Sequence, residues 1–230
     1  MKGFSADDYH AMLSNLLSNG YTILSYRQYY HRYNQDSTPL CLLRHDIDFN
    51  PESALTMIEV ERDLQVCASY YFMIEAEAYN LVAPSTMTVI SRLINHGFDT
   101  GLHYDNYSRY SLSSIDEQIA AFRLLTGDNN VKFVTLHRPL DHSISSHTSV
   151  VDYTGFKYFA DSYGCWRFGH PLESDAFLRC RNMVINTHPE WWGTPPDVSP
   201  LFVLSDLYKN RIDAIRRWML ANCYGLGKEK

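Results

Sequence analysis

Two patterns of hydrophobic and polar positions alternate along this chain. Short apolar runs, typical of buried strands, alternate with longer segments whose apolar residues recur every three or four positions, which is typical of helices. The apolar runs are, in chain order, YTIL, LCLLRH, CASYYFMI, FDTGLHY, VKFVTLH, KYFA and NMVINTH. Parallel strands need long crossover connections, usually helices, so this alternation predicts an α/β fold built on a parallel sheet.

Capping residues mark where several of the predicted helices begin and end. Ser5 can cap a helix over residues 6–19, which Gly20 would end. Ser114 and Glu117 have the spacing of a capping box at the start of another helix. Further helices are predicted from about Ser25, over residues 51–64 and 85–97, and from about Ser205 to Cys223.

The pattern does not decide between an open sheet and a closed barrel. An open doubly wound sheet and a closed or partly closed barrel both fit alternating strands and helices. The sequence has no internal repeat, low-complexity tract or clear linker, so residues 1–230 are predicted to form a single domain.

Composition narrows the cellular setting. The net charge of −6 gives no sign of a nucleic-acid or anionic-membrane partner. The N-terminal MKGFSADDYHAML lacks the apolar core of a signal peptide, and no run approaches the length of a membrane span. The five cysteines are odd in number and form no CxxC motif, which favours buried free thiols in a reducing compartment. We therefore expect a cytoplasmic protein, whose oligomeric state is left open.

Ionisable residues gather where the predicted strands end. Five strand-like runs are followed at their carboxyl side by a His, Asp or Arg, and these residues are Asp46, Asp48, His103, His137, Arg138, Asp161 and His188. In parallel α/β folds the carboxyl ends of the strands lie on one face, where active sites form. One such residue would most simply be structural, but their coincidence predicts a functional site.

These residue types suit a catalytic metal centre. One Asp and two His form a ligand set for zinc, or for cobalt, iron or manganese, and leave positions open for water and substrate. The Asp46–Ile47–Asp48 spacing allows two roles, in which one carboxylate binds the metal and the other accepts a proton from the water. Solvated loop acids would give the same spacing, so the alternative stays open here.

Five short motifs, in order, resemble those of the polysaccharide deacetylases, also called chitooligosaccharide deacetylase-like or NodB-homology proteins. They are RHDIDF, TGLHY, HRP, DSYGCWR and INTHPEWW, and they extend over residues 40–192. The resemblance implies a distorted (β/α) barrel with about seven parallel strands. It also implies an enzyme that removes acetyl groups from sugars with a divalent metal, for which this ligand set favours zinc.

The resemblance also implies roles for residues in the first three motifs. Asp46 matches the catalytic base, and Asp48 matches the aspartate that binds the metal. His103 matches the first metal-binding histidine. Arg138 resembles the arginine that orients the base. Arg44, which precedes these acids, is expected either to support the carboxylates or to form a structural salt bridge.

The second motif departs from the family pattern. The family offers a second histidine four residues after the first, but Tyr107 stands four residues after His103. A phenol, with an ordinary pKa near 10, is a poor zinc ligand. We therefore expect His137 to supply the third ligand, with Asp105 as the alternative.

The last two motifs imply a proton donor and a pocket wall. His188 matches the general acid, Asp161 resembles the acid that tunes that histidine, and Trp166 resembles a tryptophan that walls the pocket. The residues expected to bind substrate are Trp166, Arg167, Tyr104 and Trp191. For the aromatic residues of the HPEWW segment, plain packing is the alternative to stacking on a sugar ring.

The predicted function is thus a metal-dependent carbohydrate deacetylase that acts on an acetylated sugar or polysaccharide precursor. Two alternatives remain open from the sequence. One is a metal-dependent amidohydrolase with a small non-sugar substrate. The other is a non-catalytic sugar-binding module, which the missing second histidine would favour.

Overall fold

A parallel sheet of seven strands forms the centre of the protein. The computed structural model describes residues 3–32, 38–105, 114–137, 148–193 and 198–223. The strands are β1 (Thr22–Leu24), β2 (Leu40–Ile47), β3 (Ser69–Phe72), β4 (Asp99–Asp105), β5 (Val134–His137), β6 (Lys157–Ala160) and β7 (Met183–Thr187). They coincide with the seven apolar runs of the sequence, and every pairing between them is parallel.

The strand order explains how the sheet curls. It runs β5-β4-β3-β2-β7-β6, and β1 also pairs with β2. The first half of β2 pairs with β1 and the second half with β3, while β7 occupies the other edge of β2. Strands β1 and β3 thus share one edge of β2. The sheet curls into a half-barrel, so the predicted distorted (β/α) barrel is confirmed.

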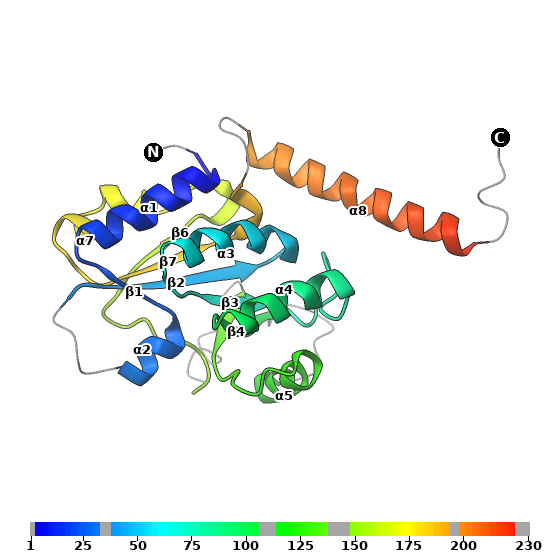
Figure 1. Ribbon diagram of the computed structural model, residues 1–230, viewed down its shortest axis with the longest axis horizontal. Helices are drawn as coiled ribbons and strands as arrows, with labels where there is room; N and C mark the ends of the chain where they lie inside the picture. Colours follow the sequence, from blue (N-terminus) through cyan, green and yellow to red (C-terminus); the bar gives the residue numbers. More distant parts are fainter. Residues whose placement is uncertain (1–2, 33–37, 106–113, 138–147, 194–197, 224–230) are drawn as a thin grey trace.

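Helices surround this sheet, and the last of them leads away from it (Figure 1). They are α1 (Ala6–Ser18), α2 (Tyr26–Arg32), α3 (Ala54–Asp63), α4 (Pro84–Asn95), α5 (Ile115–Thr126), α7 (Asp175–Leu178) and α8 (Pro200–Asn222). Both predicted serine caps are present: Ser5 begins α1 and Ser114 begins α5, each as part of a capping box. Short 3₁₀ helices are η1 (Pro51–Ser53), η2 (Ser162–Gly164), η3 (Pro171–Glu173) and η4 (Pro189–Trp191).

Alternation along the strands separates two hydrophobic cores. Leu43 of β2 belongs to the large core between the sheet and the outer helices, together with Tyr70 and Ile185. Leu42, Tyr71 and Val184, their neighbours in sequence, belong to a smaller core inside the curl. Successive side chains of a strand point to opposite faces, so each strand contributes to both cores.

The inner face of the curl is also where charged residues of β2 lie. Arg44 and Asp46 share the face of Leu42, because they follow it at intervals of two. His45 points instead to the outer side, where its Nε2 lies 2.6 Å from Glu61 Oε1 and its Nδ1 lies 2.5 Å from Thr187 Oγ1. The site described below therefore belongs to the inner face.

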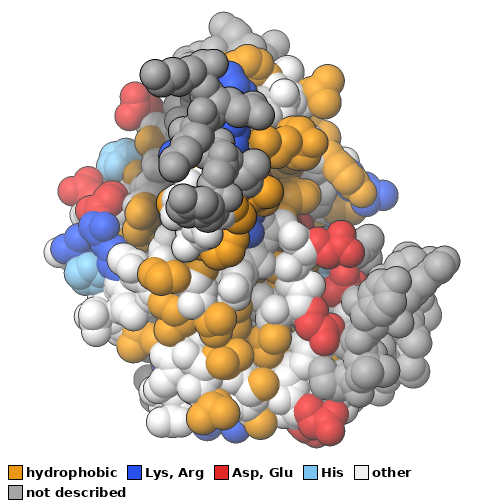
Figure 2. Space-filling model, turned by 90° about the vertical axis from the view of Figure 1, so that its right-hand side faces the viewer, with side chains coloured by type: hydrophobic (Ala, Val, Ile, Leu, Met, Phe, Trp, Pro, Cys, Tyr) orange, Lys and Arg blue, Asp and Glu red, His pale blue; other side chains and the backbone are white. Residues whose placement is uncertain are grey.

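Helix α8 differs from the prediction and extends away from the sheet (Figure 1). It begins at Pro200 rather than near Ser205, because the Ser199 side chain accepts a hydrogen bond from the Phe202 amide and proline suits the first turn. Large apolar side chains stay exposed on it, including Leu201 at 77% and Trp218 at 65%. Figure 2 views the molecule from the side on which this helix ends, and hydrophobic side chains are exposed on that face. Among the helices of the described ranges, none has the length and apolarity needed to span a membrane.

The cysteines only partly follow the sequence expectation. Cys41 lies in β2 and is buried, but Cys165, Cys180 and Cys223 are exposed. The expectation of buried thiols is therefore wrong for these three, because they lie in loops or at a helix end rather than in strands. All five are free thiols within the part of the chain that the structure describes.

Candidate active site

The carboxyl ends of the parallel strands bring the predicted polar residues to one edge of the sheet. Asp48 comes directly after β2, and His137 is the last residue of β5. Asp161 follows β6 and His188 follows β7. His103 lies in β4, in register with Thr135 of β5. The ends of five parallel strands thus bring acids and histidines into one region.

Three of these side chains form a tight group. His103 Nε2 and His137 Nδ1 lie 3.2 Å apart. Asp48 Oδ1 lies 3.4 Å from His103 Nε2 and 3.5 Å from His137 Nδ1. Within the described ranges, Asp48, His103 and His137 are the group of His, Cys, Asp and Glu side chains whose spacing could hold a metal ion.

The geometry of this group fits a divalent cation. Zinc binds His nitrogen and carboxylate oxygen at about 2.0–2.2 Å, so neighbouring ligand atoms of a tetrahedral site lie roughly 3.3–3.5 Å apart. The three distances above match that spacing. Asp48 Oδ1 is also buried and accepts no hydrogen bond from the residues that the structure describes, although a buried carboxylate oxygen normally has a partner. A cation would provide that partner.

The second ring nitrogen of His103 fixes how this histidine faces the group. His103 Nδ1 lies 2.7 Å from Thr135 Oγ1, and the Thr135 hydroxyl donates to Asp46 Oδ1 at 3.3 Å. Because the hydroxyl donates its hydrogen bond to Asp46, it accepts one from the N–H of His103 Nδ1. The tautomer that results presents the lone pair of Nε2 to Asp48 and His137, which is the form that binds metals.

Asp46 lies beside this group and is held as a carboxylate. Arg44 donates to Asp46 Oδ2, and Asn186 Nδ2 donates to the same oxygen at 2.9 Å. Burial alone would raise the pKa of Asp46, but Arg44, His103 and His188 outweigh it and lower the pKa to about 2. Asp46 is therefore ionised at neutral pH and able to accept a proton.

His188 lies on the opposite side of Asp48 and has an acidic partner. Its Nδ1 is 2.6 Å from Asp161 Oδ1, while its Nε2 is 3.8 Å from Asp48 Oδ2. Trp192 Nε1 donates to Asp161 Oδ2 at 2.7 Å and fixes that carboxylate. Burial lowers the pKa of His188, but the hydrogen bond and charge of Asp161, with Glu190 and Asp48, raise it to about 10. At neutral pH the ring is protonated and can donate from Nε2.

These side chains line one cavity of about 710 Å³, a volume in the range of small-molecule sites. Its wall includes the catalytic candidates Asp46, Asp48, His103, His137 and His188. Aromatic side chains complete it, namely Tyr153, Tyr158, Tyr163, Phe168 and Trp191. The cavity therefore combines a polar, ionisable floor with aromatic walls.

Two of the four residues expected to bind substrate lie on this wall. Arg167 and Trp191 line the cavity. Tyr104 belongs to the outer core instead, because it alternates with His103 and so points to the other face of β4. Trp166 stacks on Phe4 with ring centroids 6.3 Å apart and is not among the described residues that line the cavity.

Some predicted residues lie outside the described ranges or outside the three-residue group. Arg138 and Tyr107 lie outside the described residues. Asp105, the alternative third ligand, pairs in register with His137 but is not part of the three-residue group. The guanidinium described beside Asp46 is that of Arg44, which also donates to Tyr153 Oη at 2.7 Å. Of the two roles left open for Arg44, the structure shows direct support of Asp46.

Sequence reasoning missed two further residues that shape the site. Thr135 and Asn186, like Arg44, each stand two positions before a predicted site residue. A spacing of two puts them on the same face of the strand, one step deeper into the curl. This alternation was the signal available in the sequence. A search for polar residues two positions before each site residue, within otherwise apolar strands, would have identified them.

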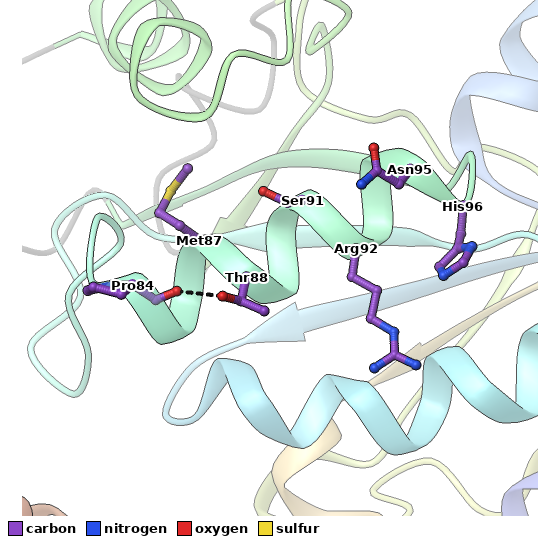
Figure 3. A pocket seen from close by; sticks show the side chains of 7 residues that line it. All are labelled: Pro84, Met87, Thr88, Ser91, Arg92, Asn95 and His96. Carbon is purple, nitrogen blue, oxygen red and sulfur yellow. Dashed lines mark hydrogen bonds between the residues drawn. The ribbon is translucent and has the colours of Figure 1, made fainter.

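A second hollow lies far from this chemistry, along the outer side of α4 (Figure 3). It has a volume of about 520 Å³ and is lined by residues from Pro84 to His96. Two of its polar side chains have partners within the protein: Thr88 Oγ1 donates to the Pro84 carbonyl at 2.8 Å, and Arg92 pairs with Glu59 of α3. This groove brings no group of catalytic residues together.

Comparisons with known proteins found matches among solved structures. No protein-family model matches the sequence, and no curated protein matches it. Among solved structures, a family 4 carbohydrate esterase from Bacillus anthracis shares 13% identity over 91% of each chain, with a TM-score of 0.43. The chitin deacetylase from the fungal pathogen Colletotrichum lindemuthianum shares 19% identity over 83% of this chain and 86% of its own, with a TM-score of 0.49. Both are enzymes of the class that the motifs resemble, but likeness at this level carries no weight for the chemistry of this chain.

Proposed function

We propose that this chain is a metal-dependent hydrolase that removes an acetyl group from an acetylated sugar. One observation carries the proposal: Asp48 lies between His103 and His137 on one side and His188 on the other, within a single cavity. A metal-binding group, a proton acceptor and a proton donor are then all within reach of one bound acetyl group.

The residues divide the chemistry between them. A divalent cation held by Asp48, His103 and His137 would supply polarisation of the acetyl carbonyl and an activated water. Asp46, ionised beside Arg44, accepts the proton of the attacking water. His188 donates its Nε2 proton to the atom that leaves the acetyl carbon, and Asp161 stabilises the ring while it is charged. Asp46 acts in its ionised form and His188 in its protonated form, which are the forms that their surroundings favour.

The cavity wall supports a sugar over other acetylated compounds. Tyr153, Tyr158 and Trp191 give it flat apolar faces with polar edges, which suit the alternating apolar and hydroxyl surfaces of a sugar ring. The motif resemblance points to the same substrate class. The grouping of His137 with Asp48 and His103 also supports an active enzyme over a non-catalytic module, since it supplies the ligand that the second motif lacks.

Release of acetate from a substrate panel tests this proposal. The panel contains N-acetylated and O-acetylated sugars together with linear and cyclic non-sugar amides. The protein is assayed as purified, after treatment with a chelator, and after reloading with zinc, cobalt or manganese. We expect release from sugars that the chelator abolishes and one of the ions restores.

Other outcomes select the alternatives. Hydrolysis confined to non-sugar amides would make the protein an amidohydrolase on the same scaffold. Sugar binding without acetate release under any metal condition would make it a binding module. Activity that survives complete removal of metal would contradict the metal-dependent mechanism.

A further inference from the structure

Glu190 lines the active-site cavity, and its carboxyl group has no hydrogen-bond partner among the described residues. It is the middle residue of η4, which follows the strand end that carries His188. Its side chain is only 3% exposed. The roles proposed above do not use it.

This lack of partners sets Glu190 apart from the other buried acids. Asp46, Asp99, Asp128 and Asp161 all have hydrogen-bonded carboxyl groups. Glu61 accepts from Tyr9 and Tyr70, and lies 2.6 Å from His45 Nε2. Unsatisfied buried groups are rare and destabilising in native proteins, and each one calls for an explanation such as a catalytic role or a bound water or ion.

Other polar atoms of the cavity wall resemble Glu190 in this respect. Arg44 Nε, Asn186 Oδ1 and Asp48 Oδ1 are buried and have no hydrogen-bond partner within the described ranges, and all three residues line the same cavity as Glu190. Donor and acceptor positions therefore remain open on several sides. Asp48 Oδ1 has an occupant in the proposed cation, but Glu190 is not part of the three-residue metal group.

The neighbours of Glu190 place it beside the proton donor. Its carboxyl group interacts electrostatically with His188 and with Asp48. Burial raises the pKa of Glu190 to about 8, against the opposing effect of His188. A cationic or hydrogen-donating ligand group would favour the ionised form and remove the unpaired state.

We propose that Glu190 accepts a hydrogen bond from the nitrogen of an N-acetylated amino sugar, and binds the amine of the deacetylated product. The inference rests on the proposed function and narrows its substrate class. The atom that leaves the acetyl carbon must lie next to His188, which protonates it, and hence close to Glu190. In an amide that atom carries a hydrogen that Glu190 can accept, whereas the bridging oxygen of an ester carries none.

The same geometry favours the product of amide cleavage. The carbon–nitrogen bond breaks as the nitrogen takes the proton of His188 Nε2, which leaves an amine with hydrogens on its nitrogen. Protonated from solution, this amine is a cation beside the Glu190 carboxylate. An ester would leave a neutral hydroxyl group at the same place, so the site distinguishes the two linkages by charge as well as by hydrogen bonding.

Binding of two probes that differ at one atom tests Glu190 without turnover. Glucosamine and glucose are titrated calorimetrically into the wild-type protein, Glu190→Gln and Glu190→Leu. The control is Glu173→Gln, an exposed glutamate in the comparable proline-led turn η3. We expect the wild type and the control to bind glucosamine at least about tenfold more tightly than glucose, and both Glu190 variants to lose about that factor.

Kinetics and stability complete the experiment. The ratio of kcat/KM for N-acetylglucosamine over an O-acetylated glucose should fall about tenfold in Glu190→Leu. The melting temperature of the Glu190 variants should stay equal or rise, because an unpaired buried carboxyl is removed; Glu61→Gln, which disrupts a satisfied carboxyl, should lower it.

The outcomes separate this inference from the proposed function. No preference for the amine in the wild type, or a preference that persists in Glu190→Leu, would overturn the role of Glu190 even if the enzyme is a deacetylase. A preference that depends on Glu190 supports that role even if no acetate is released. Absence of acetate release from every acetylated sugar counts against the proposed function alone.

Discussion

Two histidines face the same carboxylate from opposite sides of the cavity, yet their surroundings prepare them for different chemistry. His103 Nε2 lies 3.4 Å from one oxygen of Asp48, and His188 Nε2 lies 3.8 Å from the other. Their Nδ1 atoms have different partners, a threonine hydroxyl for His103 at 2.7 Å and a carboxylate for His188 at 2.6 Å. The group behind each ring, rather than the ring itself, distinguishes the two.

The partner determines which form of the imidazole is presented to the cavity. Thr135 is neutral and donates its hydroxyl hydrogen bond to Asp46, so His103 keeps a proton on Nδ1 and offers the lone pair of Nε2. Asp161 is an acid that raises the pKa of His188 to about 10 against the effect of burial, so His188 offers a proton on Nε2. Two copies of one residue type thus become a metal ligand and a proton donor.

Replacement of the donor itself should have the largest effect on turnover. His188→Ala should lower kcat for an N-acetyl sugar by about 10²–10⁴-fold, the usual contribution of general acid catalysis. The loss on an activated aryl acetate should be much smaller, because a good leaving group needs little protonation. Steady-state kinetics on both substrates checks this, and equal losses would argue against an acid role.

Removal of the acid behind His188 should convert it toward the state of His103. Asp161→Asn keeps the shape of the side chain but takes away the charge that holds the proton, so kcat should fall by roughly 10²-fold or more. The wild-type ring stays protonated up to about pH 10, and its pKa should fall in the variant.

The pH profile provides the matching measurement. Because the protonated ring is the active form, activity is lost as the pH rises through its pKa, and the alkaline limb of kcat should move to lower pH in Asp161→Asn. Metal content should be unchanged. An alkaline limb that stays in place would mean that His188 is not the group that titrates.

Loss of the hydroxyl behind His103 should have a smaller effect, and a different one. Thr135→Val removes the acceptor for His103 Nδ1 while the volume of the side chain is kept, so the ring is free to turn. We expect metal affinity to fall about 10–100-fold, as for other residues that orient metal ligands. Competition with a chromogenic chelator measures it, with Thr88→Val on the remote α4 as the control; equal affinities of the two variants would contradict the role of Thr135.

The sequence predicted the membership of the site well, because the carboxyl ends of parallel strands must meet. Asp46, Asp48, His103, His137, Asp161 and His188 are brought together as expected, although their individual roles stay predictions. Arg44, Thr135 and Asn186 lie deeper on the same faces. Their contribution depends on how strongly the sheet curls, which the local pattern does not determine.

Aromatic residues were harder to place than charged ones. Tyr104 and Trp166 occur within motifs but pack into the protein, since an aromatic ring gains as much from a core as from a ligand wall. Glu190 is the reverse case. The letters HPEWW alone gave no reason to separate it from packing, and its unpaired burial becomes visible only in the fold.

The metal content of two single variants tests the central claim most directly. His137→Ala and His188→Ala each remove one imidazole that lies within 4 Å of Asp48, at 3.5 Å and 3.8 Å respectively. Elemental analysis of protein made without a histidine tag, after saturation with zinc and exchange into metal-free buffer, gives the ions held per chain. The account predicts about one ion in the wild type and in His188→Ala, and little or none in His137→Ala. Loss of the metal from His188→Ala, with retention by His137→Ala, would contradict it and exchange the roles of the two histidines.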